Sequence, residues 1–109
     1  MVVTGNGSHF LYFLDPDDGS LVRTVETPID DLEDIAWDRG AIWASSYSEL
    51  RGRFFRLDPE TGEVLDVFAL PEEEAALCYD GIVDGLAVAD GILYVTGKHC
   101  PHVWIYELR

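Results

Sequence analysis

The sequence predicts an all-β protein, and three observations support this. "LYFLDPDDGSLVRTVE" (Leu11–Glu26) aligns with "FFRLDPETGEVLDVFA" (Phe54–Ala69) at an offset of 43 residues. "IAWDRGAIWAS" (Ile35–Ser45) aligns with "LAVADGILYVT" (Leu86–Thr96) at an offset of 51 residues. The segments "LDPDDG" and "LDPETG" place proline early and glycine late between apolar runs, which is the chemistry of hairpin turns. Repeats of this length and content indicate β-propeller blades.

The apolar runs between the turns define ten strands, rich in the aromatic and β-branched residues that suit a half-buried sheet. The segment "PEEEAALC" comes nearest to a helical period, and we expect it to form a loop with one helical turn. The strands of a blade are named A to D from the axis outward. The A strands are Asp34–Trp37 and Gly85–Val88; the B strands are Val2–Thr4, Ile42–Ser45 and Leu93–Thr96; the C strands are Phe10–Leu14, Phe54–Leu57 and Val103–Glu107; the D strands are Leu21–Val25 and Val64–Phe68.

The order along the chain is therefore BCD, ABCD, ABC, or about two and a half four-stranded antiparallel blades. Residues 1–109 form a single propeller segment, with the blade strands in residues 1–26, 33–69 and 84–109. Closed propellers have about 4 to 8 blades. We expect the segment to complete a ring by oligomerisation, as a homodimer of five blades or of six blades with some three-stranded, because an open arc exposes apolar flanks.

Composition excludes two classes of partner. The 109 residues carry a net charge of −14 from 21 acidic and 7 basic residues, so the surface repels a phosphate backbone and we expect no nucleic acid partner. No apolar run reaches the ~20 residues of a membrane span, and we expect no membrane partner. No signal peptide is visible. A hydrophobic content of 48% suits a folded domain.

The topology brings the candidate functional residues to one side. In an antiparallel blade the D-to-A and B-to-C loops share one face, which we call the top face, and the other turns lie on the bottom face. The D-to-A loops are Thr27–Glu33 and Pro71–Asp84, and the B-to-C loops are Ser46–Gly52 and Gly97–His102. We expect a small peptide or small molecule to bind there, without a cofactor. The top face collects Asp30, Asp31, Glu33, Tyr47, Cys78, Asp84, Lys98, His99, Cys100 and His102.

The two cysteines, Cys78 and Cys100, leave three alternatives open. They lie on two top-face loops and could form a disulfide or remain unpaired thiols. Together with His99 and His102 they could also ligate zinc, which favours nitrogen and sulfur ligands. The spacing of "HCPH" does not match an ordinary zinc finger, so no metal ligand is assigned.

Three segments resemble the C-terminal portion of bacterial and plant-type glutamine cyclotransferases: "HFLYFLDPDDGSLVRTVE", "RFFRLDPETGEVLDVFAL" and "DGLAVADGILYVTGKHCPHVWIYEL". The most specific parts are "YFLDP" and "VTGK" followed three residues later by proline. The resemblance implies a five-bladed propeller that converts N-terminal glutaminyl residues to pyroglutamate. It also implies a periplasmic or secreted protein. The family's N-terminal blades, with their catalytic glutamate, have no counterpart in this chain.

The resemblance also implies roles for individual residues. Lys98 matches the family's lysine near the substrate pocket, and Asp84 stands where the family has asparagine. Glu33 falls near an acidic or amide position, for which Asp30 competes. These matches imply Glu33, Asp84 and Lys98 as catalytic residues. They imply Asp30, Tyr47 and Cys100 as substrate-binding residues, with Tyr47 and Cys100 standing where the family has tryptophans.

The chemistry implied by the resemblance needs a proton acceptor and a proton donor around an oriented substrate. We expect Lys98 to approach Glu33 or Asp84 on the top face and to form such a pair. The alternative is a non-catalytic propeller segment that acts in self-assembly or ligand binding, in which Lys98 only balances an acidic face. Ammonia release from a glutaminyl dipeptide separates the two functions.

Overall fold

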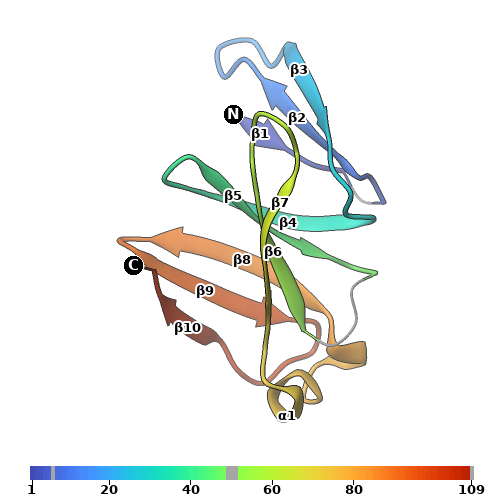
Figure 1. Cartoon of the computed structure of the whole chain (residues 1–109), viewed down its shortest axis with the longest axis vertical. Coiled ribbons are helices and arrows are strands. Elements are labelled where there is room, and N and C mark those ends of the chain that lie inside the picture. The colour runs from blue at the N-terminus through green and yellow to red at the C-terminus, as the bar shows by residue number, and fades with distance from the viewer. Residues whose placement is uncertain (6, 49–51, 109) are drawn as a thin grey trace.

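The computed structural model describes residues 1–5, 7–48 and 52–108, which fold into three antiparallel sheets (Figure 1). Each sheet follows the chain without crossovers, and the three stack along the longest axis of the molecule. Sheet 1 contains β1 (Val2–Val3), β2 (Phe10–Leu14) and β3 (Leu21–Glu26); sheet 2 contains β4 (Leu32–Asp38), β5 (Ala41–Ser46), β6 (Arg53–Leu57) and β7 (Val64–Ala69); sheet 3 contains β8 (Val83–Ala89), β9 (Ile92–Gly97) and β10 (Trp104–Glu107).

All ten predicted strands are confirmed, and the sheets have 3, 4 and 3 strands in the predicted order BCD, ABCD, ABC. The predicted helical turn is also present, as α1 (Glu72–Ala75). A 3₁₀ turn at Tyr79–Gly81 follows it and leads into sheet 3. Among the described residues, no helix has the length and apolar character needed to cross a membrane.

Two kinds of tight turn set the register of the strands. Between the C and D strands, the Asp58 carboxylate accepts the Glu60 backbone N–H at 2.8 Å, and Asp15 accepts the N–H of Asp17 at the same distance. Between the A and B strands, two-residue turns place Arg39 and the residue after it at φ of 44° and 77°, as a type I′ hairpin requires. Turns of this type match the right-handed twist of the flanking strands.

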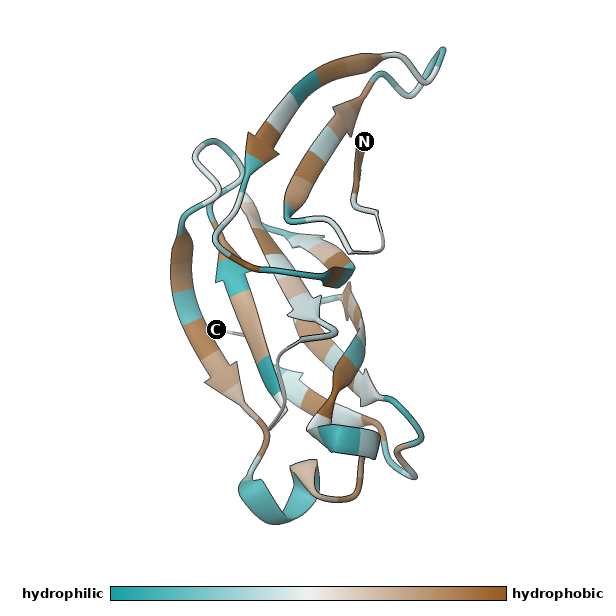
Figure 2. Cartoon of the chain, turned by 90° about the vertical axis from the view of Figure 1, so that its right-hand side faces the viewer, coloured by the Kyte–Doolittle hydropathy of each residue, from teal (hydrophilic) through white to brown (hydrophobic). Residues whose placement is uncertain are grey.

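Side chains alternate across each strand, so the inner strands β5 and β6 of sheet 2 contribute to a core on each face of that sheet. Figure 2 shows the alternation as bands of hydrophobic and hydrophilic residues along the strands. All six residues of β5 are buried, because this strand lies in the middle of the stack. On one face, Ile42 and Leu57 join Leu11 and Val25 of sheet 1 in a first core. On the other, Trp43 packs with residues of sheet 3 in a second core.

We call the contact between sheets 1 and 2 the first junction, and that between sheets 2 and 3 the second junction. At the outer edge of the first junction, the Arg23 guanidinium lies 3.8 Å from the Phe13 ring centroid and donates to the Pro59 carbonyl at 3.1 Å. Gly62 has a φ of +78°, and a Cβ there would collide with the Glu26 carbonyl oxygen. The turn before β7 therefore sits directly on sheet 1.

Candidate active site

The structure places the predicted top-face residues at one end of the three sheets, on the right-hand side of Figure 1. Backbone hydrogen bonds join the loops of this face to one another. The Tyr47 N–H donates to the Asp31 carbonyl at 2.9 Å, and the Tyr79 N–H donates to the Lys98 carbonyl at 2.7 Å. The loop between β1 and β2 takes part as well, because the Leu32 N–H donates to the Ser8 carbonyl at 2.9 Å. The top face is thus one connected layer of loops.

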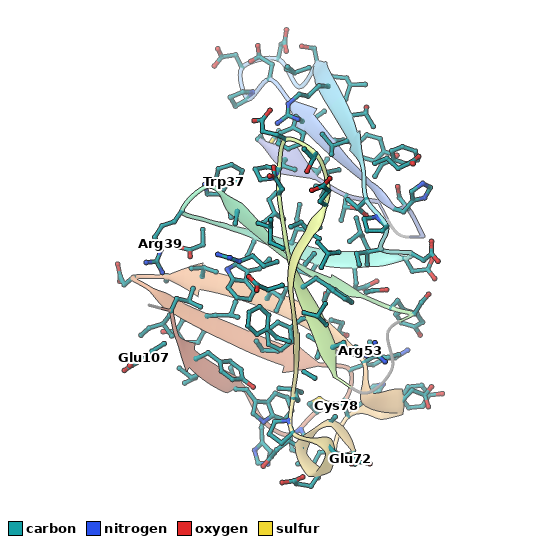
Figure 3. The ribbon with its side chains drawn as sticks, in the orientation of Figure 1. Trp37, Arg39, Arg53, Glu72, Cys78 and Glu107 are labelled. Atoms are coloured by element: carbon teal, nitrogen blue, oxygen red, sulfur yellow. A yellow bond between two sulfur atoms is a disulfide. The ribbon has the colours of Figure 1, made fainter. Side chains whose placement is uncertain are left out.

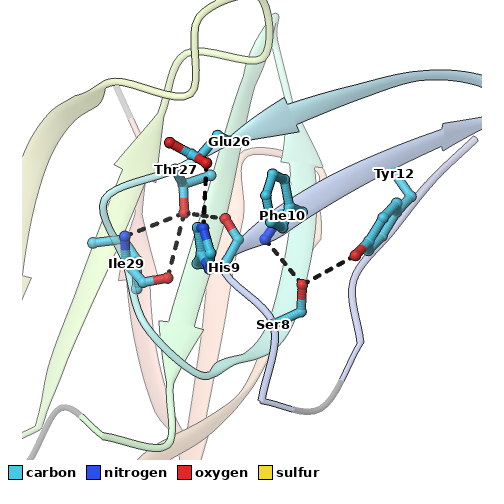
Figure 4. A network of polar contacts seen from close by, with 7 residues as sticks. All are labelled: Ser8, His9, Phe10, Tyr12, Glu26, Thr27 and Ile29. Atoms are coloured by element: carbon cyan, nitrogen blue, oxygen red, sulfur yellow. Dashed lines mark hydrogen bonds and ion pairs between the residues drawn. The ribbon is translucent and has the colours of Figure 1, made fainter.

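Thr27 fixes the first part of this layer (Figure 4). Thr27 is buried, with 4% of its surface exposed, and its hydroxyl donates to the His9 carbonyl at 2.8 Å. The same oxygen accepts the Ile29 N–H at 3.2 Å. Nearby, the Ser8 hydroxyl accepts the Phe10 N–H at 3.1 Å and contacts the Tyr12 hydroxyl at 3.3 Å. These bonds position the D-to-A loop that carries Asp30 and Asp31.

Lys98, the only lysine of the chain, is the centre of the candidate site. It follows β9 directly, and its Nζ donates to the Tyr47 hydroxyl, at the end of β5, at 2.5 Å. The Nζ lies 4.7 Å from the Tyr47 ring centroid and 4.9 Å from the Tyr79 ring centroid. Both rings keep exposed surface, 41% for Tyr47 and 55% for Tyr79. The ammonium is therefore held between two aromatic walls that remain open to a ligand.

The surroundings of Lys98 keep it charged. The hydrogen bond to Tyr47 raises the pKa of the Lys98 ammonium above its ordinary value. Desolvation opposes this rise, and electrostatic interactions with the side chains of Tyr47, Tyr79 and Asp80 add to it. At neutral pH the group is a cation and a hydrogen-bond donor, so it cannot accept a proton from a substrate amine. It is suited to hold an oxygen that gains negative charge.

The loop that carries Lys98 is fixed covalently. Cys78 and Cys100 form a disulfide with a Cα–Cα distance of 4.4 Å, which decides between the three alternatives left by the sequence. Their sulfurs are bonded to each other and are not available as thiolate ligands for zinc. Among the described residues, no group of three or more His, Cys, Asp or Glu side chains is placed to hold a metal ion. Cys78 lies beside α1 in Figure 3.

The disulfide explains the glycine of the "VTGK" segment. A Cβ on Gly97 would collide with the Cys100 sulfur and would lie 2.6 Å from the Ile82 carbonyl oxygen. It would also lie 2.7 Å from the Cys78 sulfur. The Lys98 N–H donates to the same Ile82 carbonyl at 3.0 Å. Only glycine leaves room for the disulfide to pack against the end of β9, and this packing directs Lys98 toward Tyr47.

The predicted pairing of Lys98 with Glu33 or Asp84 stays a prediction. All three lie at the top-face end of their sheets, but among the described ion pairs none joins Lys98 to either carboxylate. Glu33 is exposed on β4 and Asp84 is half-buried on β8. The acidic residue that acts on the Lys98 charge is Asp80, whose φ of 54° turns the chain within the 3₁₀ segment. The described contacts of the Lys98 ammonium are therefore with the side chains of Tyr47 and Tyr79.

Asp34 is a residue that the sequence reasoning did not select. One carboxylate oxygen accepts the Leu86 N–H of sheet 3 at 2.8 Å, and the other accepts the Ile35 N–H at 3.0 Å. The Asp34 N–H donates to the hydroxyl of Ser45, which is fully buried. Asp34 therefore joins sheets 2 and 3 beside the candidate site. An acidic residue at the start of the apolar strand "DIAW" was the available signal.

The other candidates have defined positions. Asp30 is exposed, and its carbonyl accepts the Ser46 hydroxyl at 2.5 Å. Cys100 is in the disulfide, so any contact of its sulfur with substrate stays a prediction. The His99 ring meets the Tyr79 ring edge-on at 6.1 Å, and His102 meets Trp104 in the same way. Both histidines are exposed, outside the Tyr47–Lys98–Tyr79 cluster.

Comparison with known proteins gives the family. The family model of the glutamine cyclotransferases matches residues 1–109, the whole chain. The chain belongs to the glutamine cyclotransferase family. This confirms the resemblance carried by the "YFLDP" and "VTGK" segments. No curated protein matches the chain.

Solved structures share the fold. The chain is similar to the glutaminyl cyclase of Myxococcus xanthus, with a TM-score of 0.73 and 24% identity over 94% of this chain and 50% of that chain. It is also similar to a chain of the mitotic checkpoint complex, with a TM-score of 0.62, 17% identity and coverage of 93% and 29%. A third similar chain is the computationally designed Ika8 protein, with a TM-score of 0.55, 14% identity and coverage of 94% and 28%. The chain spans about half the length of the Myxococcus enzyme.

Proposed function

We propose that this chain carries the lysine side of a glutaminyl cyclase site, which forms pyroglutamate from N-terminal glutaminyl peptides. The observation that supports this most is the Lys98 ammonium, hydrogen-bonded to Tyr47 at 2.5 Å and flanked by the Tyr79 ring. The family match over the whole chain supports the same reaction. Because the chain spans half of the Myxococcus enzyme, the activity is proposed for the site as completed by further blades.

The proposed reaction is an intramolecular acyl transfer. The α-amine nitrogen of the substrate attacks the carbonyl carbon of its own side-chain amide, and the new C–N bond closes a five-membered lactam. The C–N bond of the amide then breaks and ammonia leaves. One proton moves off the attacking amine, and the leaving nitrogen gains one. The site must therefore bend the substrate chain, accept a proton and stabilise the oxygen that becomes negative.

The described residues suit these three tasks. Lys98 would donate to the amide oxygen, because its raised pKa keeps it an ammonium. The exposed faces of Tyr47 and Tyr79 would hold the substrate side chain. Glu33 or Asp84, at the same end of the sheets and with no ion pair to Lys98 among the described residues, would accept the proton of the amine.

Ammonia release from a glutaminyl dipeptide tests the proposal. We expect release with the chain to be slow, because the proposed site is complete only with further blades, and to decrease by at least about a hundredfold in K98M, as for the loss of one charge-stabilising donor. K98R is the matched control, because it keeps the charge and a donor, and it should retain more activity than K98M. Equal rates with wild type and K98M would contradict a role for Lys98.

The second candidate function is a non-catalytic propeller segment, favoured by the exposed apolar surface on its flanks. Val22 on β3 is 64% exposed and Ile105 on β10 is 63% exposed. We propose that two copies associate through the outward faces of sheets 1 and 3, giving a two-fold ring of six sheets. Size exclusion with light scattering should then give twice the monomer mass. A mass near the 12.2 kDa of one chain would contradict the dimer.

A further inference from the structure

The disulfide joins the two loops of sheet 3 that take part in the candidate site. Tyr79 directly follows Cys78 in the D-to-A loop, and Lys98 precedes Cys100 by two residues in the B-to-C loop. The Lys98 Nζ lies 4.9 Å from the Tyr79 ring centroid, so the bridge links the loop of the ammonium to the loop of one of its aromatic walls. The other wall, Tyr47, follows β5 of sheet 2 and lies outside the bridge.

The Tyr79 side chain is placed by the contact between these two loops. It is 55% exposed, and its described ring contacts are with the Lys98 ammonium and with the His99 ring, both from the B-to-C loop. The Tyr79 N–H donates to the Lys98 carbonyl at 2.7 Å. The chain around it is irregular, because Asp80 has a φ of 54° inside the 3₁₀ turn. The position of Tyr79 therefore depends on the neighbouring loop rather than on core packing.

The two sulfurs fill the space between the loops. A Cβ on Gly97 would collide with the Cys100 sulfur and would lie 2.7 Å from the Cys78 sulfur, so the end of β9 closes one side of the bridge. The Cα atoms of the two cysteines are 4.4 Å apart, at the short end of the usual range. Two thiol sulfurs need a wider separation than two bonded sulfurs. With β9 against them, they gain this separation when the loops move apart.

We propose that Cys78–Cys100 is a site of thiol–disulfide exchange with a dithiol, and that the oxidation state of this pair sets the distance between Lys98 and Tyr79. In the oxidised chain the ammonium has both aromatic walls. In the reduced chain the loop of Tyr79 separates from that of Lys98, and the ammonium keeps only Tyr47. That reduction also weakens the binding of a glutaminyl peptide rests on the proposed function.

The exchange starts at Cys100, which is partly exposed, whereas Cys78 is 6% exposed. A thiolate of the dithiol attacks the Cys100 sulfur, a mixed disulfide forms, and the bond to Cys78 breaks. The second thiolate of the reagent then attacks the reagent sulfur of the mixed disulfide, and Cys100 leaves. Both cysteine thiolates take up a proton. The pair has gained two electrons and two protons, and the dithiol has been oxidised to its own disulfide.

The effect of reduction should be local. The second core packs Trp43 of sheet 2 against Leu93 and Val95 of sheet 3, and the cysteines lie outside this cluster. The first junction has no part in the bridge. We therefore expect the three sheets to persist when the pair is reduced.

The test follows the side-chain NMR signal of Lys98, the only lysine, in the full chain without ligand. An aromatic ring shifts the resonances of nuclei close to its face, so this signal reports on Tyr47 and Tyr79. It is recorded in the oxidised chain, after reduction by dithiothreitol and after reoxidation, with the free thiols counted in each state. We expect the signal to move on reduction toward that of a solvent-exposed lysine, and to return on reoxidation.

Variants assign this response to its parts. C78S/C100S cannot form the bridge, so its Lys98 signal should match that of the reduced chain and should not respond to dithiothreitol. Y79A removes the ring, so reduction should move its Lys98 signal much less than that of wild type. Y79F is the matched control, because it keeps the ring and should respond as wild type does.

A second measurement tests control of binding. A glutaminyl dipeptide is titrated with the oxidised and the reduced chain, and we expect its affinity to be about threefold or more lower after reduction, as for the loss of one partly exposed aromatic contact. Binding to neither state, with a Lys98 signal that still responds to reduction, would contradict the proposed function and support the exchange site.

Four other results would overturn the proposal. The first is a pair that dithiothreitol does not reduce in the folded chain. The second is a Lys98 signal that stays in place, or moves equally in Y79A, when the thiol count shows full reduction. The third is equal affinity for the dipeptide in both states. The fourth is loss of β structure in circular dichroism on reduction, which would show that the bridge supports the fold as a whole.

Discussion

The first and second junctions are built from the same repeat, yet different contacts hold them. Both have an apolar core between two sheets, centred on Leu57 in the first and Leu93 in the second. At the first junction the outer edge is filled by the turn before β7. At the second, the outer edge is a cavity, and the added contacts lie at the top face instead: the disulfide, Asp34 and Lys98. The functional candidates therefore gather where the second junction departs from the repeat.

If this comparison is right, the two cores should contribute equally to the free energy of unfolding. Leu57 is fully buried and Leu93 is 1% exposed, so truncation to alanine leaves a cavity in either case. We expect L57A and L93A each to lower the free energy of unfolding by about 2 to 5 kcal/mol, measured by urea denaturation. A small effect of L93A beside a large effect of L57A would show that the second junction depends on the disulfide rather than on packing.

The disulfide should matter next. It closes a loop of 22 residues, and removing such a bridge costs about 3 kcal/mol in the chain-entropy description. In urea denaturation, the double variant C78S/C100S should have a free energy of unfolding that is lower by that amount. Its strands should persist in circular dichroism, because the first junction has no part in the bridge. Loss of all β structure in the variant would contradict the view of two separately packed junctions.

Two glycines in equivalent turns allow the same substitution to be compared with and without a contact to another sheet. We expect their effects on stability to be smaller than those of the core and disulfide variants. Gly19 and Gly62 have φ of +75° and +78°, but only Gly62 lies against another sheet. G19A should cost about 1 to 2 kcal/mol for the left-handed backbone alone. G62A should cost more, because its Cβ meets the Glu26 carbonyl. Equal costs for the two variants would mean that the turn before β7 is not fixed on sheet 1.

The strands could be predicted from the sequence because their signals are local. Alternating apolar residues and the DPxxG and Asp-Gly turns lie within a few residues of the strands that they define. The contacts of the candidate site could not be predicted, since they join distant positions. Lys98 and Tyr47 are 51 residues apart, and Asp34 binds the Leu86 N–H across 52 residues. The pairing of Cys78 and Cys100 could not be predicted for the same reason. The two cysteines lie on different loops, and the sequence does not show that these loops are adjacent.

Lys98 also has a predictable pH response. Because its folded pKa is raised, its ammonium and the contacts with Tyr47 and Tyr79 are fully present below the ordinary lysine value of 10.5. They are lost only as the pH rises through the raised pKa. Between pH 6 and 9 we therefore expect no loss of ligand binding that traces to Lys98, and any titration in that range must come from other groups.

The most direct measurement is the NMR signal of the Lys98 side chain, which can be assigned without ambiguity because the chain contains one lysine. The signal should titrate above pH 10.5 in the folded chain. A glutaminyl dipeptide at neutral pH should shift it in a saturable way, while an alanyl dipeptide of the same length should not. An unshifted signal at saturating glutaminyl dipeptide, or equal shifts with both peptides, would contradict the assignment of Lys98 to the recognition of a side-chain amide.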